Sequence, residues 1–208
     1  MPRTAKPKPR RRLEADAARE LILDATEQRL VEAGPSGIRL QEVAADAGLS
    51  HSTVLHHFGS RELLVKAVIT RSTETINARL IEAIQASSGD DTQLETIFEN
   101  VAEALERTGN ARVVLWLALE GHPVKDGKVR LSDVVDAAHA LRLTRKKHAK
   151  KPAREDTART VVLATLALVG SSVLAPTLLA DAGLPADARA GAEFRKWLAR
   201  LLIAHLDG

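Results

Sequence analysis

The sequence predicts an all-α protein, and both its composition and its periodicity support that fold class. Of its 208 residues, 45% are hydrophobic but only 2% are aromatic, and tyrosine is absent. A core must therefore be built from Leu, Val, Ile and Ala, and this composition mixed with charged residues favours helices. Apolar residues also recur three and four positions apart, so about nine helices are expected.

The first twelve residues form a basic arm that is expected to be disordered. Its charged side chains are all positive: Arg3, Lys6, Lys8, Arg10, Arg11 and Arg12. Removing these six charges from the net charge of +3 leaves −3 for the rest of the chain. The arm is expected to bind a polyanion, with a solubilising tail as the alternative. Its prolines oppose the amphipathic helix of a transit peptide, and no apolar signal region is visible.

Three short or medium helices follow the arm. The first is expected from about Ala15 to Ala33, where a Gly-Pro pair stops it. A second helix over residues 40–47 ends at Gly48. Ser50 is a suitable N-cap for a third helix, which ends near Phe58.

Longer helices make up the middle of the chain. A fourth helix is expected from a Ser60 cap to about residue 86, followed by a helix over 92–107 with apolar residues at helical spacing. Residues 113–120 are apolar without a clear period, which indicates a helix buried on most sides. Ser132 is expected to cap the next helix, which leads into the basic cluster 145–151.

Two apolar segments end the chain. Residues 160–180 carry no charge and are long enough to cross a membrane. Because polar residues and Pro176 interrupt them, we instead expect an enclosed helix that also needs a partner chain. The last segment carries an amphipathic stripe, and both segments are expected to meet their copies in a two-fold four-helix interface. The interface residues expected are Leu166, Val169, Val173, Phe194, Trp197, Leu198, Leu201 and Leu202.

The stretch GLSHSTVLHHF, residues 48–58, holds three histidines but no lysine, arginine or carboxylate. Metal ligands on one helix need a spacing of three or four residues, whereas His51 and His56 are five apart and His57 is adjacent. The chain contains no cysteine, and no nucleophile with a neighbouring base is recognisable. We therefore expect no metal, no cofactor and no enzymatic activity. The absence of cysteine also favours an intracellular protein.

Only Val54, Leu55 and Phe58 of this helix are expected to point inward, which leaves its other sides polar. The major groove of B-DNA is a polar, patterned surface, and it is wide enough to admit one α-helix. A small Ala44, a turn at Gly48 and an inward Val54 match the spacing of a helix-turn-helix. The segment is therefore interpreted as a DNA reader.

The segment IRLQEVAADAGLSHSTVLHHFGSRELL, residues 38–64, resembles the DNA-binding region of the tetracycline-repressor (TetR) family of transcriptional regulators. The matching features are the Gly-Leu-Ser turn, the His-His-Phe ending and the Gly-Ser-basic-Glu-Leu-Leu that follows. The resemblance covers about residues 18–68. It implies a DNA-binding domain over 13–66 and a ligand-binding and dimerisation domain over 67–208. It also implies a cytoplasmic homodimer that binds a palindromic operator and usually represses.

The resemblance implies particular roles for several side chains. Thr53 and His56 would face base edges, while His57 and Arg61, which stands where a lysine is common, would each contact a phosphate. Leu55 replaces the usual tyrosine, which removes a hydroxyl directed at the phosphates. The full set expected on double-stranded DNA is Arg39, which replaces a threonine, Gln41, Ser50, His51, Ser52, Thr53, His56, His57 and Arg61, with Arg10, Arg11 and Arg12 of the arm.

Charge in the expected DNA-binding domain is unfavourable for a polyanion. Residues 13–66 hold five basic and nine acidic side chains. The arm is therefore expected to compensate, with a salt slope of roughly −0.9 for each phosphate contact. Deletion of residues 1–12 should weaken operator binding and flatten that slope.

The resemblance further implies that a small-molecule effector binds beyond residue 68 and moves the fourth helix, which changes the separation of the two recognition helices. A mainly aliphatic pocket for a modest apolar ligand is expected. Its candidate lining residues, for each of which a core or loop position is the alternative, are Phe98, Val101, Trp116, Leu119, His122, Leu141 and Thr165. Two rival classes are a small helical enzyme and a non-specific DNA binder that uses the arm.

Overall fold

The computed structural model describes residues 9–121, 127–145 and 151–207, with side chains described from residue 14 to residue 206 of these ranges. These residues form helices and no strand, which confirms the all-α prediction. The elements in chain order are α1 (Pro9–Ala33), a 3-10 turn (Pro35–Gly37), α2 (Leu40–Asp46), α3 (His51–Phe58), α4 (Arg61–Ala86), α5 (Asp91–Thr108), α6 (Asn110–Leu119), α7 (Leu131–Thr144), α8 (Arg154–Asp181) and α9 (Ala188–Asp207).

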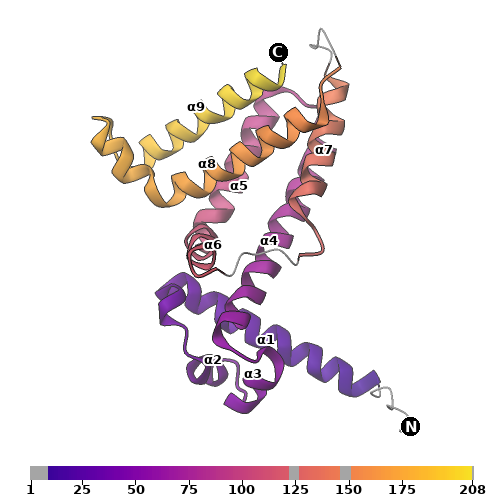
Figure 1. The fold of residues 1–208 in the computed structure, drawn as a ribbon, viewed down its shortest axis with the longest axis vertical. Coiled ribbons are helices and arrows are strands. Elements are labelled where there is room, and N and C mark those ends of the chain that lie inside the picture. Colours follow the sequence, from indigo (N-terminus) through magenta and orange to yellow (C-terminus); the bar gives the residue numbers. More distant parts are fainter. Residues whose placement is uncertain (1–8, 122–126, 146–150, 208) are drawn as a thin grey trace.

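The helices are arranged in two lobes that α4 connects (Figure 1). The lobe called the head here contains α1, α2, α3 and the beginning of α4, residues 9–69. The second lobe, called the body, contains the rest of α4 and α5 to α9, residues 70–207. Helix α6 lies where the two lobes meet, so it is placed to contact both.

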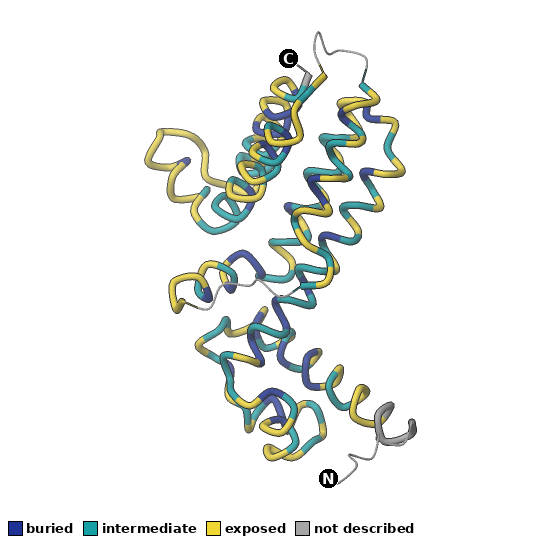
Figure 2. Tube along the Cα trace, turned by 45° about the vertical axis from the view of Figure 1, so that its right-hand side comes forward, coloured by how far each residue is buried: buried dark blue, intermediate teal, exposed yellow. Residues whose placement is uncertain are grey.

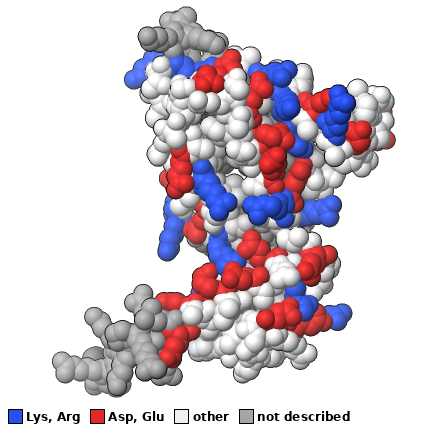
Figure 3. All heavy atoms as spheres, turned by 180° about the vertical axis from the view of Figure 1, so that it is seen from behind, with Lys and Arg blue, Asp and Glu red and all other residues white. Residues whose placement is uncertain are grey.

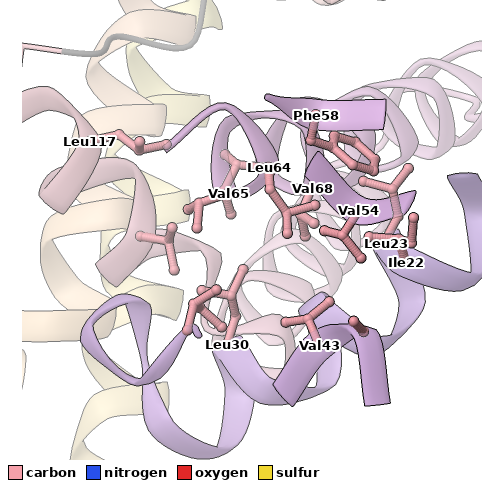
Figure 4. Packing of buried hydrophobic residues seen from close by; sticks show 14 residues of the cluster. Ile22, Leu23, Leu30, Val43, Val54, Phe58, Leu64, Val65, Val68 and Leu117 are labelled. Atoms are coloured by element: carbon pink, nitrogen blue, oxygen red, sulfur yellow. The ribbon is translucent and has the colours of Figure 1, made fainter. Parts of the chain in front are cut away.

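The head encloses one apolar core, which Figure 4 shows from close by. Helices α1 to α4 supply most of it, and Val113 and Leu117 of α6 complete it. Burial of each such aliphatic side chain contributes about 1.5–3 kcal/mol relative to exposure. The core residues are Ile22, Leu23, Leu30, Ile38, Val43, Ala44, Val54, Phe58, Leu64, Val65, Val68, Ile69, Val113 and Leu117. The core of the head thus extends to Ile69, a few residues past the expected boundary at residue 66, and is completed by α6 of the body.

Three predicted helix starts were wrong. Helix α1 begins at Pro9 rather than near Ala15, so the last residues of the arm that was expected to be disordered are helical, and residues 1–8 lie outside the described part. Proline is tolerated in the first turn because that turn lacks hydrogen-bond partners for its N–H groups. Helix α8 begins at Arg154, before the uncharged segment. Helix α7 begins at Leu131 without a Ser132 cap, because Asp133 accepts the N–H of Arg130 at 2.8 Å.

Polar contacts tie the helices of the body together. The buried Arg142 of α7 donates to Asp156 at 2.6 Å and to the Leu206 carbonyl at 2.9 Å, so one guanidinium joins α7, α8 and α9. Arg195 of α9 reaches Glu99 of α5 at 2.6 Å. By contrast, many positions along α8 and α9 are exposed, as Figure 2 shows.

Candidate nucleic-acid interface

A tight turn sets α3 across α2. Gly48 has φ 66°, a left-handed conformation that glycine adopts without strain, and the Leu49 N–H donates to the Ala44 carbonyl at 2.8 Å. Ala44 and Val43 are buried where the two helices meet. These observations confirm the turn that the sequence predicts, and together α2, the turn and α3 form a helix-turn-helix.

The start of α3 is fixed by its predicted cap. The Ser50 hydroxyl accepts the backbone N–H of Thr53 at 3.1 Å and lies 2.8 Å from the hydroxyls of both Ser52 and Thr53. At the other end, Phe58 is buried and the Arg19 guanidinium lies 4.4 Å from its ring centre. Val54 is fully buried between them, so α3 is held to the head along one side only.

The remaining sides of α3 are open to solvent. His51, Ser52 and His56 are exposed, while Thr53 and His57 are half-buried. The rings of His56 and His57 meet edge to face at 5.7 Å. Leu55 was expected to point inward, but its side chain is 39% exposed. The prediction was wrong because α3 is short and only the line through Val54 and Phe58 meets the core.

Ion pairs lock α2 against α1. Arg29 of α1 binds both Glu42 and Asp46 of α2, and its guanidinium holds the pKa of the Asp46 carboxyl below the usual range. Arg39, at the start of α2, has a side chain 78% exposed and lies 3.2 Å from Glu42. Gln41 is exposed beside it. Arg39 and Gln41 are therefore accessible to a partner.

Arg61, which the resemblance implies contacts a phosphate, has a side chain that is 33% exposed and makes contacts within the chain. Its guanidinium donates to the Pro35 carbonyl and lies 5.5 Å from the ring centre of Trp116 in α6. Its Nε is the buried side-chain atom without a hydrogen-bond partner among the described residues. Arg61 therefore joins the head to α6, because the aromatic face of Trp116 attracts the guanidinium cation.

Charge on the head is divided between its faces. On the face shown in Figure 3, carboxylates gather along α1, which would repel nucleic acid. Arg10, Arg11 and Arg12 belong to the first turns of α1, but their side chains lie outside the described part of the chain. The exposed face of α3 carries no carboxylate, so it is the part of the head best suited to a polyanion.

A cavity of about 300 Å³ lies in the body between α4, α5, α6, α7, α8 and α9. Four of the candidate ligand residues line it: Phe98, Val101, Leu141 and Thr165. Most of the other lining residues are aliphatic, with Asn77 and Asn110 among the polar exceptions. The cavity therefore has an apolar wall with few hydrogen-bonding groups.

Two other candidates for the pocket were wrong. Trp116 packs against the head core and Arg61, and Leu119 is 88% exposed at the end of α6. Helix α6 turns its Asn110 and Val114 toward the cavity instead. His122 lies outside the described residues.

The residues expected at a dimer interface divide into two groups. Leu166, Trp197 and Leu201 are more than half exposed, and Val169, Val173 and Phe194 are half-buried. Leu198 and Leu202 are buried within their own chain, so they were wrongly assigned. The exposed apolar surface also includes residues that the stripe did not predict: Val162, Leu163, Leu174, Leu178 and Leu184.

Within the described ranges, α8 is long and apolar enough to cross a membrane, and only 6% of its most apolar window is buried. Length and composition alone are weak evidence for a membrane span, since core helices of soluble proteins meet the same criteria. Among the described side chains, no group of three or more His, Asp or Glu residues is placed to hold a metal ion.

The fold and the α2–turn–α3 geometry define a helix-turn-helix protein. Residues 22–68 match the family described as bacterial regulatory proteins, tetR family. The helix-turn-helix region of the chain is therefore similar to the DNA-binding region of tetR-family regulators.

Two relatives and one solved structure illustrate the similarity. A transcriptional repressor of Mycobacterium tuberculosis is 29% identical over 58% of this chain and 57% of its own. UidR, a transcriptional regulator of Escherichia coli, is 30% identical over 52% of this chain and 54% of its own. A TetR-family regulator from Mesorhizobium loti shares the fold, with a TM-score of 0.65 at 15% identity over 92% of this chain and 96% of its own. The chain thus spans little more than half the length of these curated relatives, both of which are described as transcriptional regulators.

Proposed function

We propose that the chain is a ligand-responsive transcriptional repressor that binds a palindromic operator as a homodimer in the cytoplasm. The observation that carries this proposal is the exposed face of α3, where three histidines, two serines or threonines and no carboxylate stand on a rigidly capped helix. Such side chains donate to and accept from base edges and phosphates. The match of residues 22–68 to the tetR family and the similarity to two curated regulators support the same function.

Selection of bound sequences from a random DNA pool tests the proposal. The expected result is an inverted repeat whose half-sites are spaced for two recognition helices, one helical turn or a multiple apart. Enrichment of no sequence, with binding that depends only on salt, would instead indicate a non-specific DNA binder.

A matched pair of histidine variants sharpens this test. His56→Ala should weaken binding to the selected site by about tenfold or more, since a good base contact contributes about 1–3 kcal/mol. His205→Ala removes a histidine of α9 that is also exposed and lies in the body, and it should leave the affinity unchanged.

Dimer formation is proposed through the apolar surface of α8 and α9. Leu163, Leu166 and Leu174 of α8 are each half or more exposed, and exposed apolar residues gathered on one element mark interaction surfaces. A second copy would bury this surface across a two-fold axis, because both copies present the same patch. Analytical ultracentrifugation should give twice the mass of one chain.

An apolar effector is proposed for the cavity of the body. Its volume of about 300 Å³ is at the lower end of small-molecule sites, and its wall is mostly aliphatic. Thermal-shift screening with aliphatic alcohols, ketones and carboxylic acids of medium chain length should raise the melting temperature. Val101→Trp, which fills the cavity from α5, should abolish that shift.

A further inference from the structure

Leu55 stands apart from the other apolar residues of α3. Val54 and Phe58 are buried, whereas Leu55 is 39% exposed. Successive helix residues differ by 100°, so Leu55 lies about 80° from the middle of the buried line, at the edge of the exposed face that holds Ser52 and His56. Its side chain is therefore partly covered by the chain and partly open to a partner.

The dimensions of α3 place Leu55 within reach of bases when the helix enters a major groove. Eight residues span about 12 Å, close to the groove width, so the middle of the helix faces the groove along its length. Phosphates and sugars offer an aliphatic side chain no favourable polar contact. The one apolar group on the base edges of the major groove is the C5-methyl group of thymine.

We infer that Leu55 is a specificity-determining residue that packs on a thymine C5-methyl group in each half-site. This inference rests on the proposed function, because it assumes that α3 enters the groove. It adds a requirement for thymine at the base pair beside those that His56 and Thr53 contact. The sequence requirement would then come from an apolar contact as well as from hydrogen bonds.

Single-atom changes in the DNA test the inference. Each thymine of the selected operator is replaced in turn, in both half-sites, by deoxyuridine, which lacks only the methyl group. One symmetric pair should weaken binding of the wild-type protein by about 15-fold, since each lost methyl contact corresponds to about fourfold. Leu55→Ala should bind the thymine operator more weakly and bind the thymine and deoxyuridine operators equally at that pair.

Val31→Ala is the matched control. Val31 is 52% exposed on α1 and outside the helix-turn-helix, so its truncation should leave the 15-fold ratio intact. Circular dichroism should show that both variants are as helical as the wild type.

Each other outcome overturns the inference. If every deoxyuridine is tolerated, if the half-site has no thymine, or if the penalty persists in Leu55→Ala, then Leu55 does not read a methyl group, although the operator still supports the proposed function. If no symmetric site is selected, the proposed function itself fails and the inference fails with it.

Discussion

The head buries its large apolar residues, whereas the C-terminal pair of helices, α8 and α9, leaves many of them exposed. In the head, Ile22, Val43 and Leu64 are almost completely buried, and four helices close around them. On α8 and α9, Leu166, Trp197 and others of similar size are more than half exposed. A single chain therefore completes the part with the helix-turn-helix but leaves an apolar surface on α8 and α9. The difference indicates that the apolar residues of the head are covered within the chain, with α6 completing the core, whereas many of those on α8 and α9 are not.

The largest expected effect tests the closed core of the head. Leu64→Ala should lower the free energy of unfolding by about 3 kcal/mol, because it leaves a cavity at a fully buried position of α4. Urea denaturation followed by circular dichroism measures this loss. The neighbouring Leu63 is 55% exposed, so Leu63→Ala should cost only about 0.5 kcal/mol. Equal losses for the two variants would contradict the burial that defines the head.

The next prediction concerns the open surface of α9. Trp197 is 57% exposed and its ring lies 5.9 Å from that of Phe194. If a second copy covers it, Trp197→Ala should raise the dimer dissociation constant about 30-fold, the effect of removing an aromatic side chain worth about 2 kcal/mol. Sedimentation equilibrium over a range of concentrations measures the constant.

A control separates loss of an interface from loss of surface hydrophobicity in general. Leu119→Ala truncates a leucine that is 88% exposed on α6, and it should leave the dissociation constant unchanged. A Trp197→Ala protein that dimerises as tightly as the wild type would place the interface elsewhere.

A smaller effect is expected at a polar contact that ties the helices of the body together. Asp156→Asn removes the charge that pairs with the buried Arg142 at 2.6 Å. Loss of one partner of a buried pair costs about 3–5 kcal/mol, but the Asp156 side chain is 37% exposed, so we expect about 1.5 kcal/mol at neutral pH. Thermal denaturation of the body helices at constant protein concentration measures it.

The Asp156 carboxylate should also make the stability of the body depend on pH under acidic conditions. The bond from Arg142, followed by that from His205, holds the pKa of Asp156 below its usual value. Its stabilisation is therefore complete above the unfolded pKa, about 3.9, and is lost as the pH falls through the lower pKa of the folded state. Below about pH 4 the stability of the wild type should fall more steeply than that of Asp156→Asn. If the stability of the two proteins changes with pH in the same way, Asp156 does not cause the acid dependence.

The sequence predicted the head better than the body because the head depends on local signals. Ser50, Ser60 and Gly48 act on backbone groups within a few residues, and the structure confirms all three. The direction of Arg61 depends on Trp116, which is 55 positions away along the chain, so no local pattern reports it.

The apolar stripe of α9 shows a second limit of sequence interpretation. The stripe was interpreted as one face, but it holds two. Leu198 and Leu202, four residues apart, pack inside the chain, while Trp197 and Leu201, also four apart, remain exposed. Periodicity shows that a helix has apolar sides, but only the packed neighbours show which side is already covered.

The smallest expected effect concerns the junction between the two regions. Because the Arg61 guanidinium bonds to Pro35 and lies over Trp116, Arg61→Ala should lower the free energy of unfolding by about 1 kcal/mol. If these contacts hold the guanidinium in place when the operator binds, the slope of log affinity against log salt should not change in Arg61→Ala. Arg39→Ala removes an arginine whose side chain is 78% exposed and should make the slope less negative by roughly 0.9 if Arg39 meets a phosphate. Fluorescence anisotropy titrations at several salt concentrations measure both slopes. If the slope becomes less negative in Arg61→Ala by the same amount, Arg61 leaves Trp116 when the head binds DNA. Operator binding would then break the contact between the head and α6.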